Sequence, residues 1–392
     1  MEKKMSKIKV ACPCIFGLES VLSAEVKKLG VQNIEVTDGR VTFMGDLEDV
    51  AKANIWLRTA ERVLIVLGSF RAETFEELFQ GVKALEFENF IRKEDAFPVK
   101  GWSLNSKLHS VPDCQSIVKR AIVKRLSEKY GQNWFEETGC RVQVQFSILK
   151  NIVTVMLDTS GAGLHKRGYR QNANIAPIKE TLAAGIVDLA RIRNDSLVYD
   201  PFCGSGTLLI EAALYALNIA PGINRRFSAE RWSIFSDDTF KRVRREALEQ
   251  IDRKASFRGY GYDIDPAAVE LTQENARKAG VANRFQIAQR DIADFHTDEL
   301  RALILTNPPY GERMLEVKEA QKIYRTMGRV FERRKYLSYY IISPDEQFED
   351  LFGSGADRRR KLYNGMIKCQ LYMYFKGEPE KPAAARQENR NE

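Results

Sequence analysis

The chain has 392 residues, of which 44% are hydrophobic and 29% charged, a composition typical of a globular protein with room for two domains. Its net charge of +8 permits an anionic partner such as nucleic acid but does not require one. The chain has no apolar run of about 18 residues and no zinc-ligand spacing among its six cysteines and three histidines. We therefore expect neither a membrane span nor a metal site.

The N-terminal residues are basic and then apolar, which imitates a secretion signal. Pro13 interrupts the apolar run, Glu19 and Glu25 follow on an amphipathic helix, and no small-residue cleavage site comes after it. We therefore expect a cytoplasmic protein whose cysteines are reduced and mostly buried.

Residues 1–165 alternate short helices and strands without an evident catalytic cluster. Apolar residues at helical spacing predict the helices, and strict alternation of apolar residues predicts the strands. In chain order we expect a helix over 17–29, a strand over 40–44, a short helix near 46–53, a strand over 63–67, a helix over 73–84, and paired strands over 142–148 and 152–157.

Residues from about 170 to 376 repeat a pattern in which a strand is followed by a helix. This alternation predicts an α/β fold with a doubly wound, mainly parallel sheet. The C-terminal stretch, 377–392, lacks apolar periodicity and is expected to be disordered. The predicted strands are 196–199, 257–262, 285–288, 302–305, 337–342, 361–363 and 366–375.

Polar or glycine-rich clusters follow the first four of these strands, and ligands of such sheets bind beyond the carboxyl ends of the strands. The first cluster, DPFCGSGT from Asp200 to Thr207, places glycines between a strand and a helix, where the backbone can approach a ligand closely. It lacks the Lys of a phosphate-binding loop and the third glycine of a dinucleotide motif. An ordinary tight turn would also explain it.

Two acidic clusters come next. In GYGYDIDP, Asp263 ends a strand at the position where a ribose diol finds an acceptor, whereas Asp265 before Pro266 can simply cap the following helix. Asp291 and Ile292 can supply an acceptor and an apolar face to an adenine ring, although a strand-end Asp alone is not specific. Together the two clusters are consistent with a nucleoside site.

The fourth cluster, Asn307–Pro308–Pro309–Tyr310, is the most specific for chemistry. The Asn307 oxygen and the Pro308 carbonyl can accept the two protons of an exocyclic amine, and Tyr310 can stack on its ring. This arrangement aims the amine lone pair at a methyl donor, so positioning and local electrostatics suffice without a metal or a covalent intermediate. A rigid turn would explain the prolines but not Asn307 and Tyr310.

DPFCGSGT, GYDIDP, RDIADF and TNPPYGER resemble, in order and spacing, motifs I to IV of class I S-adenosylmethionine-dependent amino-methyltransferases. With HKRGYRQNANIAPIKETLAA and the opening CPCIFGLESVLSAEVKKLG, the chain resembles bacterial THUMP-domain methyltransferases that act on guanine N2 of 23S rRNA. The resemblance extends to residue 376 and does not include the second methyltransferase domain of some members. It implies a ferredoxin-like region over 1–60, a THUMP RNA-binding domain over 61–165, and a Rossmann-like, seven-stranded methyltransferase domain over 166–376.

The resemblance also implies S-adenosylmethionine as the methyl donor and a role for each matching residue. The target amine would be held by Asn307, Pro308 and Tyr310. The cofactor would be bound by Pro177, Ile178, Asp200, Cys203, Gly204, Gly206, Asp263, Ile264, Asp291, Ile292 and Asn307.

Basic residues that alternate with an aromatic ring are typical of nucleic-acid contacts. Lys166, Arg167, Tyr169 and Arg170 show this pattern next to the segment expected to close over the cofactor, and we expect them to contact RNA. The other basic runs are typical of solvated helix faces. The expected partner is 23S rRNA or a large-subunit precursor.

Three alternatives to guanine-N2 methylation of 23S rRNA stay open. The Asn-Pro-Pro-Tyr motif also serves adenine-N6 DNA methyltransferases, and THUMP domains also occur in transfer-RNA guanine-N2 enzymes. A non-catalytic RNA-binding or ribosome-assembly factor would keep the fold and fail to bind the cofactor. The intact residues Asn307 and Tyr310 favour an enzyme.

Overall fold

The computed structural model describes residues 7–170, 178–311 and 314–375, which form two compact units. The first unit contains the residues up to Gly168 together with Asn218–Ile251, and the second contains Tyr169–Leu217 and the residues from Asp252 onward. Pro177 and the tail over 377–392 lie outside the described residues. Within the described ranges, no helix is both long and apolar enough to cross a membrane.

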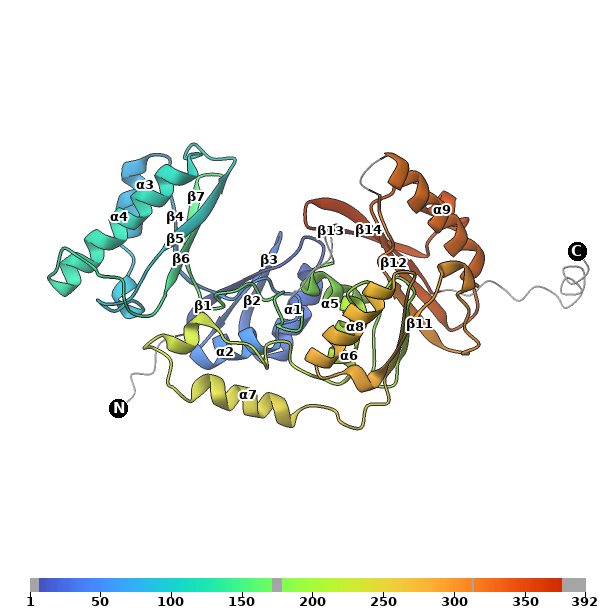
Figure 1. The fold of residues 1–392 in the computed structure, drawn as a ribbon. Helices are drawn as coiled ribbons and strands as arrows, with labels where there is room; N and C mark the ends of the chain where they lie inside the picture. Colours follow the sequence, from blue (N-terminus) through green and yellow to red (C-terminus); the bar gives the residue numbers. More distant parts are fainter. Residues whose placement is uncertain (1–6, 171–177, 312–313, 376–392) are drawn as a thin grey trace, which may run out of the picture. The chain divides into compact units, whose positions relative to one another are not determined.

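The first unit contains a seven-stranded sheet (Figure 1). The strands follow one another across it in the order β2-β3-β1-β4-β7-β6-β5, with β5 and β6 parallel and the other neighbours antiparallel. Their bounds are β1 (Ile8–Pro13), β2 (Gln32–Thr37), β3 (Arg40–Gly45), β4 (Leu64–Arg71), β5 (Val99–Leu104), β6 (Gln143–Leu149) and β7 (Ile152–Asp158).

Helices cover parts of this sheet because apolar side chains alternate along its strands. In β6, Val144, Phe146 and Ile148 are buried in the same core as the apolar face of a long helix, whereas Gln143 and Gln145 point to the opposite face. The helices of this part are α1 (Glu19–Lys28), α2 (Leu47–Trp56), α3 (Phe75–Lys83) and the long α4 (Val111–Tyr130).

Residues 218–251, which fall inside the range expected for the methyltransferase domain, pack within the first unit. Helix α7 (Thr239–Glu249) lies against α2, and Arg242 forms an ion pair with Glu48 at 2.7 Å. Trp232 is 1% exposed and donates through Nε1 to the carbonyl of Arg141 at 3.0 Å. The apolar side chains of this segment thus complete the core of the first unit.

The second unit contains another seven-stranded sheet, in the order β10-β9-β8-β11-β12-β14-β13. The first five of these strands are parallel, and β14 is antiparallel to both of its neighbours. This topology confirms the predicted mainly parallel sheet. The strands are β8 (Leu197–Asp200), β9 (Arg258–Asp263), β10 (Phe285–Gln289), β11 (Ala302–Thr306), β12 (Leu337–Ser343), β13 (Arg358–Asn364) and β14 (Ile367–Tyr374).

The side chains of β9 differ between the two faces of this sheet. A Cβ added to Gly261 would lie 2.8 Å from Leu209 Cδ1, so the glycine allows close approach of a helix. On the other face Tyr260 stacks on Tyr199 with ring centroids 4.8 Å apart. The helices of this unit are α5 (Glu180–Leu189), α6 (Thr207–Ala216), α8 (Pro266–Lys278), α9 (Met314–Val330) and α10 (Phe348–Phe352).

Candidate active site

The strand order of the second sheet reverses between β8 and β11, which pair with each other while the strands that follow them lie on opposite sides. Ligands of open α/β sheets bind at such a switch point, beyond the carboxyl ends of the strands. Asp200 ends β8 and Thr306 ends β11, and the Thr306 hydroxyl donates to Asp200 Oδ1 at 2.9 Å. The structure therefore brings the first and fourth sequence clusters together.

Asp200 is the most deeply buried carboxyl group of this edge, with 1% of its surface exposed. Burial raises the pKa of Asp200 to about 7, while hydrogen bonds from the Thr306 hydroxyl and the Phe202 N–H favour the ionised form and oppose this increase. In this position Asp200 fastens the end of β8 to the end of β11. Contact between Asp200 and a cofactor stays a prediction.

Asp263 connects the loop after β8 with the loop after β9. Its Oδ2 accepts the N–H of Gly204 at 2.9 Å, and its Oδ1 accepts the N–H of Asp265 at 3.0 Å. A carboxylate has about four acceptor positions, so Asp263 can still accept a hydrogen bond from a diol. Asp265 caps α8 through its side chain, which confirms the helix-cap interpretation of that residue.

The glycine loop between β8 and α6 depends on residues without a large side chain. Gly206 has φ +77°, and a Cβ there would lie 2.8 Å from Thr272 Cγ2. Cys203 donates its N–H to the carbonyl of Tyr262 at 2.9 Å, and burial raises the pKa of the Cys203 thiol well above its usual range. The backbone of Cys203 therefore holds the loop against β9, and the buried thiol stays neutral.

Two side chains of α8 that the sequence analysis missed hold the same loop from the other side. The Thr272 hydroxyl donates to the Gly204 carbonyl at 2.8 Å, and Asn275 Nδ2 donates to the Ser205 carbonyl at 2.9 Å. Both side chains are almost completely buried. Polar residues three positions apart on the buried face of an amphipathic helix were the available sign of this role.

The residues expected to frame an adenine ring have different surroundings. Ile264, directly after β9, is 65% exposed, and its apolar side chain is available to a flat ring. Asp291 is exposed and caps the short helix over Ile292–Asp294. Ile292 is buried in the core that includes Tyr324 of α9. Of these residues, Ile264 presents an apolar surface, while the roles of Asp291 and Ile292 toward an adenine stay predictions.

The Asn-Pro-Pro-Tyr segment directly follows β11. Tyr310 is half-buried, and its hydroxyl donates to Asn307 Oδ1 at 2.5 Å. Burial raises the pKa of Tyr310 well above its usual range, so this hydroxyl remains a donor at neutral pH. Tyr324 donates to the Pro309 carbonyl at 2.9 Å, whereas within the described residues no donor reaches the carbonyl of Pro308.

The Tyr310 hydroxyl has a partner within the same segment, and stacking of the Tyr310 ring on a target base stays a prediction. This hydroxyl takes one acceptor position of the Asn307 oxygen and thereby fixes the orientation of the amide. One acceptor position of that oxygen and the Pro308 carbonyl remain for a target amine. The segment thus offers two hydrogen-bond acceptors beside the glycine loop.

Arg170 and Tyr169 anchor the start of the second unit. Arg170 donates to the Ile178 carbonyl at 3.0 Å and to Thr207 Oγ1 at 3.1 Å, and it pairs with Glu180 at 3.0 Å. Tyr169 is 4% exposed and contacts Glu211 through its hydroxyl. These bonds hold the residues before and after 171–177, which lie outside the described ranges together with Pro177.

The expected RNA-contacting set is therefore only partly on the surface. Arg167 is 5% exposed and donates to the carbonyls of Leu164 and Arg58, so it stabilises the first unit from within. Lys166 is exposed. Because Arg167, Tyr169 and Arg170 have partners inside their own units, a proposal of RNA contact rests on Lys166 among these four.

The residues at this edge fit S-adenosylmethionine. Asp263 suits the ribose diol, Ile264 an adenine face, and the loop at Gly204 and Gly206 a close approach of the methionine moiety at the start of α6. Among the described residues, no three His, Cys, Asp or Glu side chains gather as they would around a metal ion.

The fold and this edge define a class I methyltransferase, and comparison with protein families agrees. Residues 167–373 match an RMKL-like methyltransferase domain, residues 9–64 match the RlmL ferredoxin-like domain, and residues 72–158 match the THUMP domain. The chain belongs to this RMKL-like methyltransferase family. It is a methyltransferase that uses S-adenosylmethionine.

Two curated relatives carry names that refer to RNA methylation. The chain is 43% identical to the Bacillus subtilis protein named "Putative RNA methyltransferase YpsC" over 95% of this chain and 97% of that protein. It is 31% identical to the ribosomal RNA large subunit methyltransferase K/L of Psychromonas ingrahamii, over 95% of this chain and 50% of that protein. The chain thus spans about half the length of this K/L relative.

Solved structures extend the similarity to three dimensions. The chain is 41% identical to SMU.472, "a putative methyltransferase" whose crystal structure was solved with SAH, and the two structures superpose with a TM-score of 0.90. The match covers 96% of this chain and 100% of SMU.472. A Listeria monocytogenes protein described as a predicted N6-adenine-specific DNA methylase is 43% identical, with a TM-score of 0.90, over 95% of this chain and 97% of that one. The names of these relatives therefore refer to methylation of both RNA and DNA.

Proposed function

We propose that the protein transfers a methyl group from S-adenosylmethionine to the exocyclic N2 amine of a guanine in large-subunit (23S) ribosomal RNA. The observation that carries this proposal is the position of Asn307 and Pro308 at the strand-order switch point, next to the glycine loop and Asp263. There, two acceptors for an amine adjoin the residues that suit the cofactor.

The action of the chain's own residues follows from these acceptors. A purine amine is a poor nucleophile because its lone pair is delocalised into the ring. When Asn307 Oδ1 and the Pro308 carbonyl accept its two protons, the nitrogen becomes more tetrahedral and its lone pair is directed to one side. The bound cofactor supplies an electrophilic methyl group. The Tyr310 hydroxyl keeps the Asn307 oxygen in place.

An RNA substrate is supported by the family assignment and by the names of the relatives. One full-length relative is named as an RNA methyltransferase, and the K/L relative is named for large-subunit ribosomal RNA. The THUMP match over residues 72–158 lies in a unit separate from the methyltransferase site. We infer that this unit contacts RNA while the second unit carries the chemistry.

A second candidate is adenine-N6 methylation of DNA, because a solved neighbour carries that description and an adenine amine would suit the same two acceptors. The test is transfer of tritiated methyl groups from S-adenosylmethionine to ribosomal RNA, transfer RNA and DNA from a strain that lacks the protein, followed by nucleoside analysis. We expect N2-methylguanosine in large-subunit ribosomal RNA. Label in transfer RNA would change the substrate, and N6-methyladenine in DNA would replace the proposal.

A further inference from the structure

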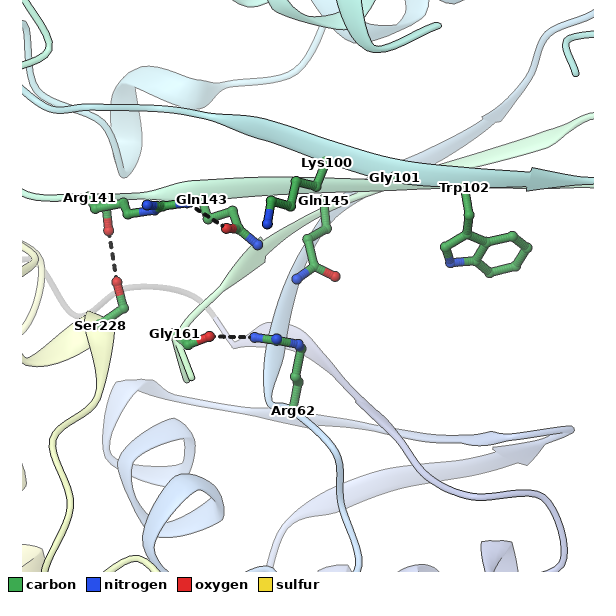
Figure 2. A pocket seen from close by; sticks show the side chains of 9 residues that line it. All are labelled: Arg62, Lys100, Gly101, Trp102, Arg141, Gln143, Gln145, Gly161 and Ser228. Atoms are coloured by element: carbon green, nitrogen blue, oxygen red, sulfur yellow. Dashed lines mark hydrogen bonds between the residues drawn. The ribbon is translucent and has the colours of Figure 1, made fainter. Parts of the chain in front are cut away.

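A pocket of about 510 Å³ opens in the first unit, mostly on strands of the THUMP region (Figure 2). A volume of this size accommodates a small ligand. The lining combines cations, amides and one indole ring, and its main side chains are Arg62, Lys100, Trp102, Arg141, Gln143 and Gln145.

Strand geometry places these side chains on one face of the sheet. Lys100 and Trp102 alternate with other residues along β5, and the parallel pairing of β5 with β6 sets Lys100 beside Gln145. The opposite face carries buried residues such as Val144, which pack toward α4. Figure 2 shows Lys100, Gln145 and Trp102 extending toward the side where Arg62 lies.

The pocket carries positive charge that the protein does not neutralise. Among the described residues, neither Lys100 nor Arg141 pairs with a carboxylate, and Arg141 contacts only the amide oxygen of Gln143 with its guanidinium, at 3.0 Å. Arg62, by contrast, is paired with buried Asp158. Free cations beside an indole that is 50% exposed suit a phosphate and a flat base.

Asp158 fixes the orientation of Gln145. Gln145 Nε2 donates to Asp158 Oδ2 at 2.9 Å, and an ionised carboxylate can only accept hydrogen bonds. Burial raises the pKa of Asp158, and its pairing with Arg62 opposes this increase. The other amide atom of Gln145, Oε1, has no donor within the described part of the chain. The pocket therefore contains an oriented acceptor.

We propose that this pocket binds one unpaired nucleotide of the substrate. The base stacks on Trp102, its exocyclic amine donates to Gln145 Oε1, and the adjacent phosphate lies by Lys100 and Arg141. The proposal rests on the proposed function in taking RNA as the substrate. It requires an unpaired nucleotide because the bases of a duplex are stacked on one another and their amines are already paired.

The first test compares two bases that differ at one amine. Cytosine carries an exocyclic amine where uracil carries a carbonyl oxygen, so fluorescein-labelled oligocytidylate of about eight nucleotides should bind about fivefold more tightly than oligouridylate in fluorescence anisotropy. In Gln145→Leu the two affinities should become equal. Equal affinities in the unmodified protein would overturn the assignment of Gln145.

The second test separates stacking from general attraction. Trp102→Ala should weaken binding of oligocytidylate about tenfold, whereas Trp134→Ala, at an indole that is 79% exposed in the same unit, should change it less than about twofold. Trp102 is half-exposed, so its removal should leave the fold intact, and thermal melting checks this. Unchanged binding by folded Trp102→Ala would overturn the proposal.

The third test uses salt dependence. Each of Lys100→Ala and Arg141→Ala should reduce the slope of log affinity against log salt by about 0.7. Lys124→Ala on α4, the helix over the opposite sheet face, serves as the matched control and should leave the slope unchanged. A loss with Lys124→Ala and none with Lys100→Ala would place the RNA on the helical face and contradict the proposal.

The failure of this inference and that of the proposed function give different results. If the unmodified protein methylates ribosomal RNA but Trp102→Ala binds oligocytidylate normally, only the pocket assignment is wrong. If the unmodified protein transfers no methyl group to RNA, the proposed function is wrong, whatever the oligonucleotide affinities. Affinity of Trp102→Ala for S-adenosylmethionine should equal that of the unmodified protein, since Trp102 belongs to the first unit.

Discussion

At the residue scale, the two aspartates at the end of β9 have separate roles although they are only two positions apart in the sequence. Asp263 accepts backbone N–H groups from the loops after β8 and β9, while Asp265 caps α8. The sequence allowed both roles for these carboxylates and could not show that Asp263 also holds Gly204. That bond joins residues 59 positions apart, so no local pattern predicts it.

The two aspartates give a matched pair of variants. Asp263→Ala removes the acceptor proposed for the ribose and frees the glycine loop, so we expect affinity for S-adenosylmethionine to fall at least about tenfold. Asp265→Ala removes a helix cap and should cost about 1 kcal/mol of stability while affinity stays within about twofold. Isothermal titration calorimetry distinguishes them, and equal losses of affinity would refute the separation of roles.

Asp200 should make stability depend on pH. Its folded-state pKa, about 7, lies above its ordinary value of 3.8, so the folded state binds more protons and stability falls as pH rises between these values. Asp200→Asn keeps the Oδ1 acceptor of both hydrogen bonds. Relative to the unmodified protein, the free energy of unfolding of Asp200→Asn should increase by roughly 2–3 kcal/mol as the pH rises from about 5 to about 8.

Denaturant unfolding at several pH values, monitored by hydrogen exchange in α6, measures this difference in the free energy of unfolding. The control is Asp252→Asn, because an exposed hydrogen bond from Asn194 lowers the pKa of Asp252. Asp252→Asn should instead lower stability at neutral pH, and this loss should disappear as the pH falls through the lowered pKa of Asp252. If the stability difference between Asp200→Asn and the unmodified protein does not change with pH, the pKa of Asp200 is the same in the folded and unfolded states.

At the element scale, α8 is both a cover for the sheet and the support of the glycine loop. Thr272→Val keeps the shape of the side chain and removes the hydroxyl that donates to the Gly204 carbonyl. We expect a loss of about 1–2 kcal/mol in stability and a several-fold weaker affinity for S-adenosylmethionine. Thr297→Val, at a hydroxyl bonded to Tyr199, is the control whose cofactor affinity should not change.

The elements that the sequence predicted are those with a strong local period. The helices over 17–29 and 73–84 and the strands after which the motifs occur are confirmed within a few residues. In the first unit, the strands β1, β2 and β5 and the helices α4 and α7 were missed. Exposed residues fill β2, and α4 carries charged residues between buried ones, so its apolar face is sparse. Their positions follow from pairing and packing with distant parts of the chain.

At the scale of the whole molecule, the residues of the first unit are not contiguous in the sequence. Residues 218–251 leave the methyltransferase region and pack with the N-terminal part. The local sequence pattern of this segment does not show which core its apolar residues join. A hydrophobic face indicates that the segment is buried but does not indicate what it packs against. The mainly parallel sheet was predictable because strands and helices alternate in the sequence, whereas the roles of the residues at its strand ends stay predictions.

The assignment of this segment predicts where a core variant acts. Trp232→Ala should destabilise the first unit by about 3–5 kcal/mol, because the indole is buried and bonded to Arg141. Hydrogen exchange should accelerate in α2 and β6 and remain unchanged in α6 and α8. Faster exchange confined to α6 and α8 would show that the segment stabilises the second unit.

We propose that Asn307, at the carboxyl end of β11, positions the N2 amine of a guanine in large-subunit ribosomal RNA for methylation. Nucleoside mass spectrometry of ribosomal RNA from a deletion strain that expresses either the unmodified chain or Asn307→Ala tests this role. We predict that the unmodified chain restores N2-methylguanosine and that Asn307→Ala reduces it at least about hundredfold, although the purified variant still binds S-adenosylmethionine. Full restoration of N2-methylguanosine by Asn307→Ala would show that Asn307 does not position the target amine.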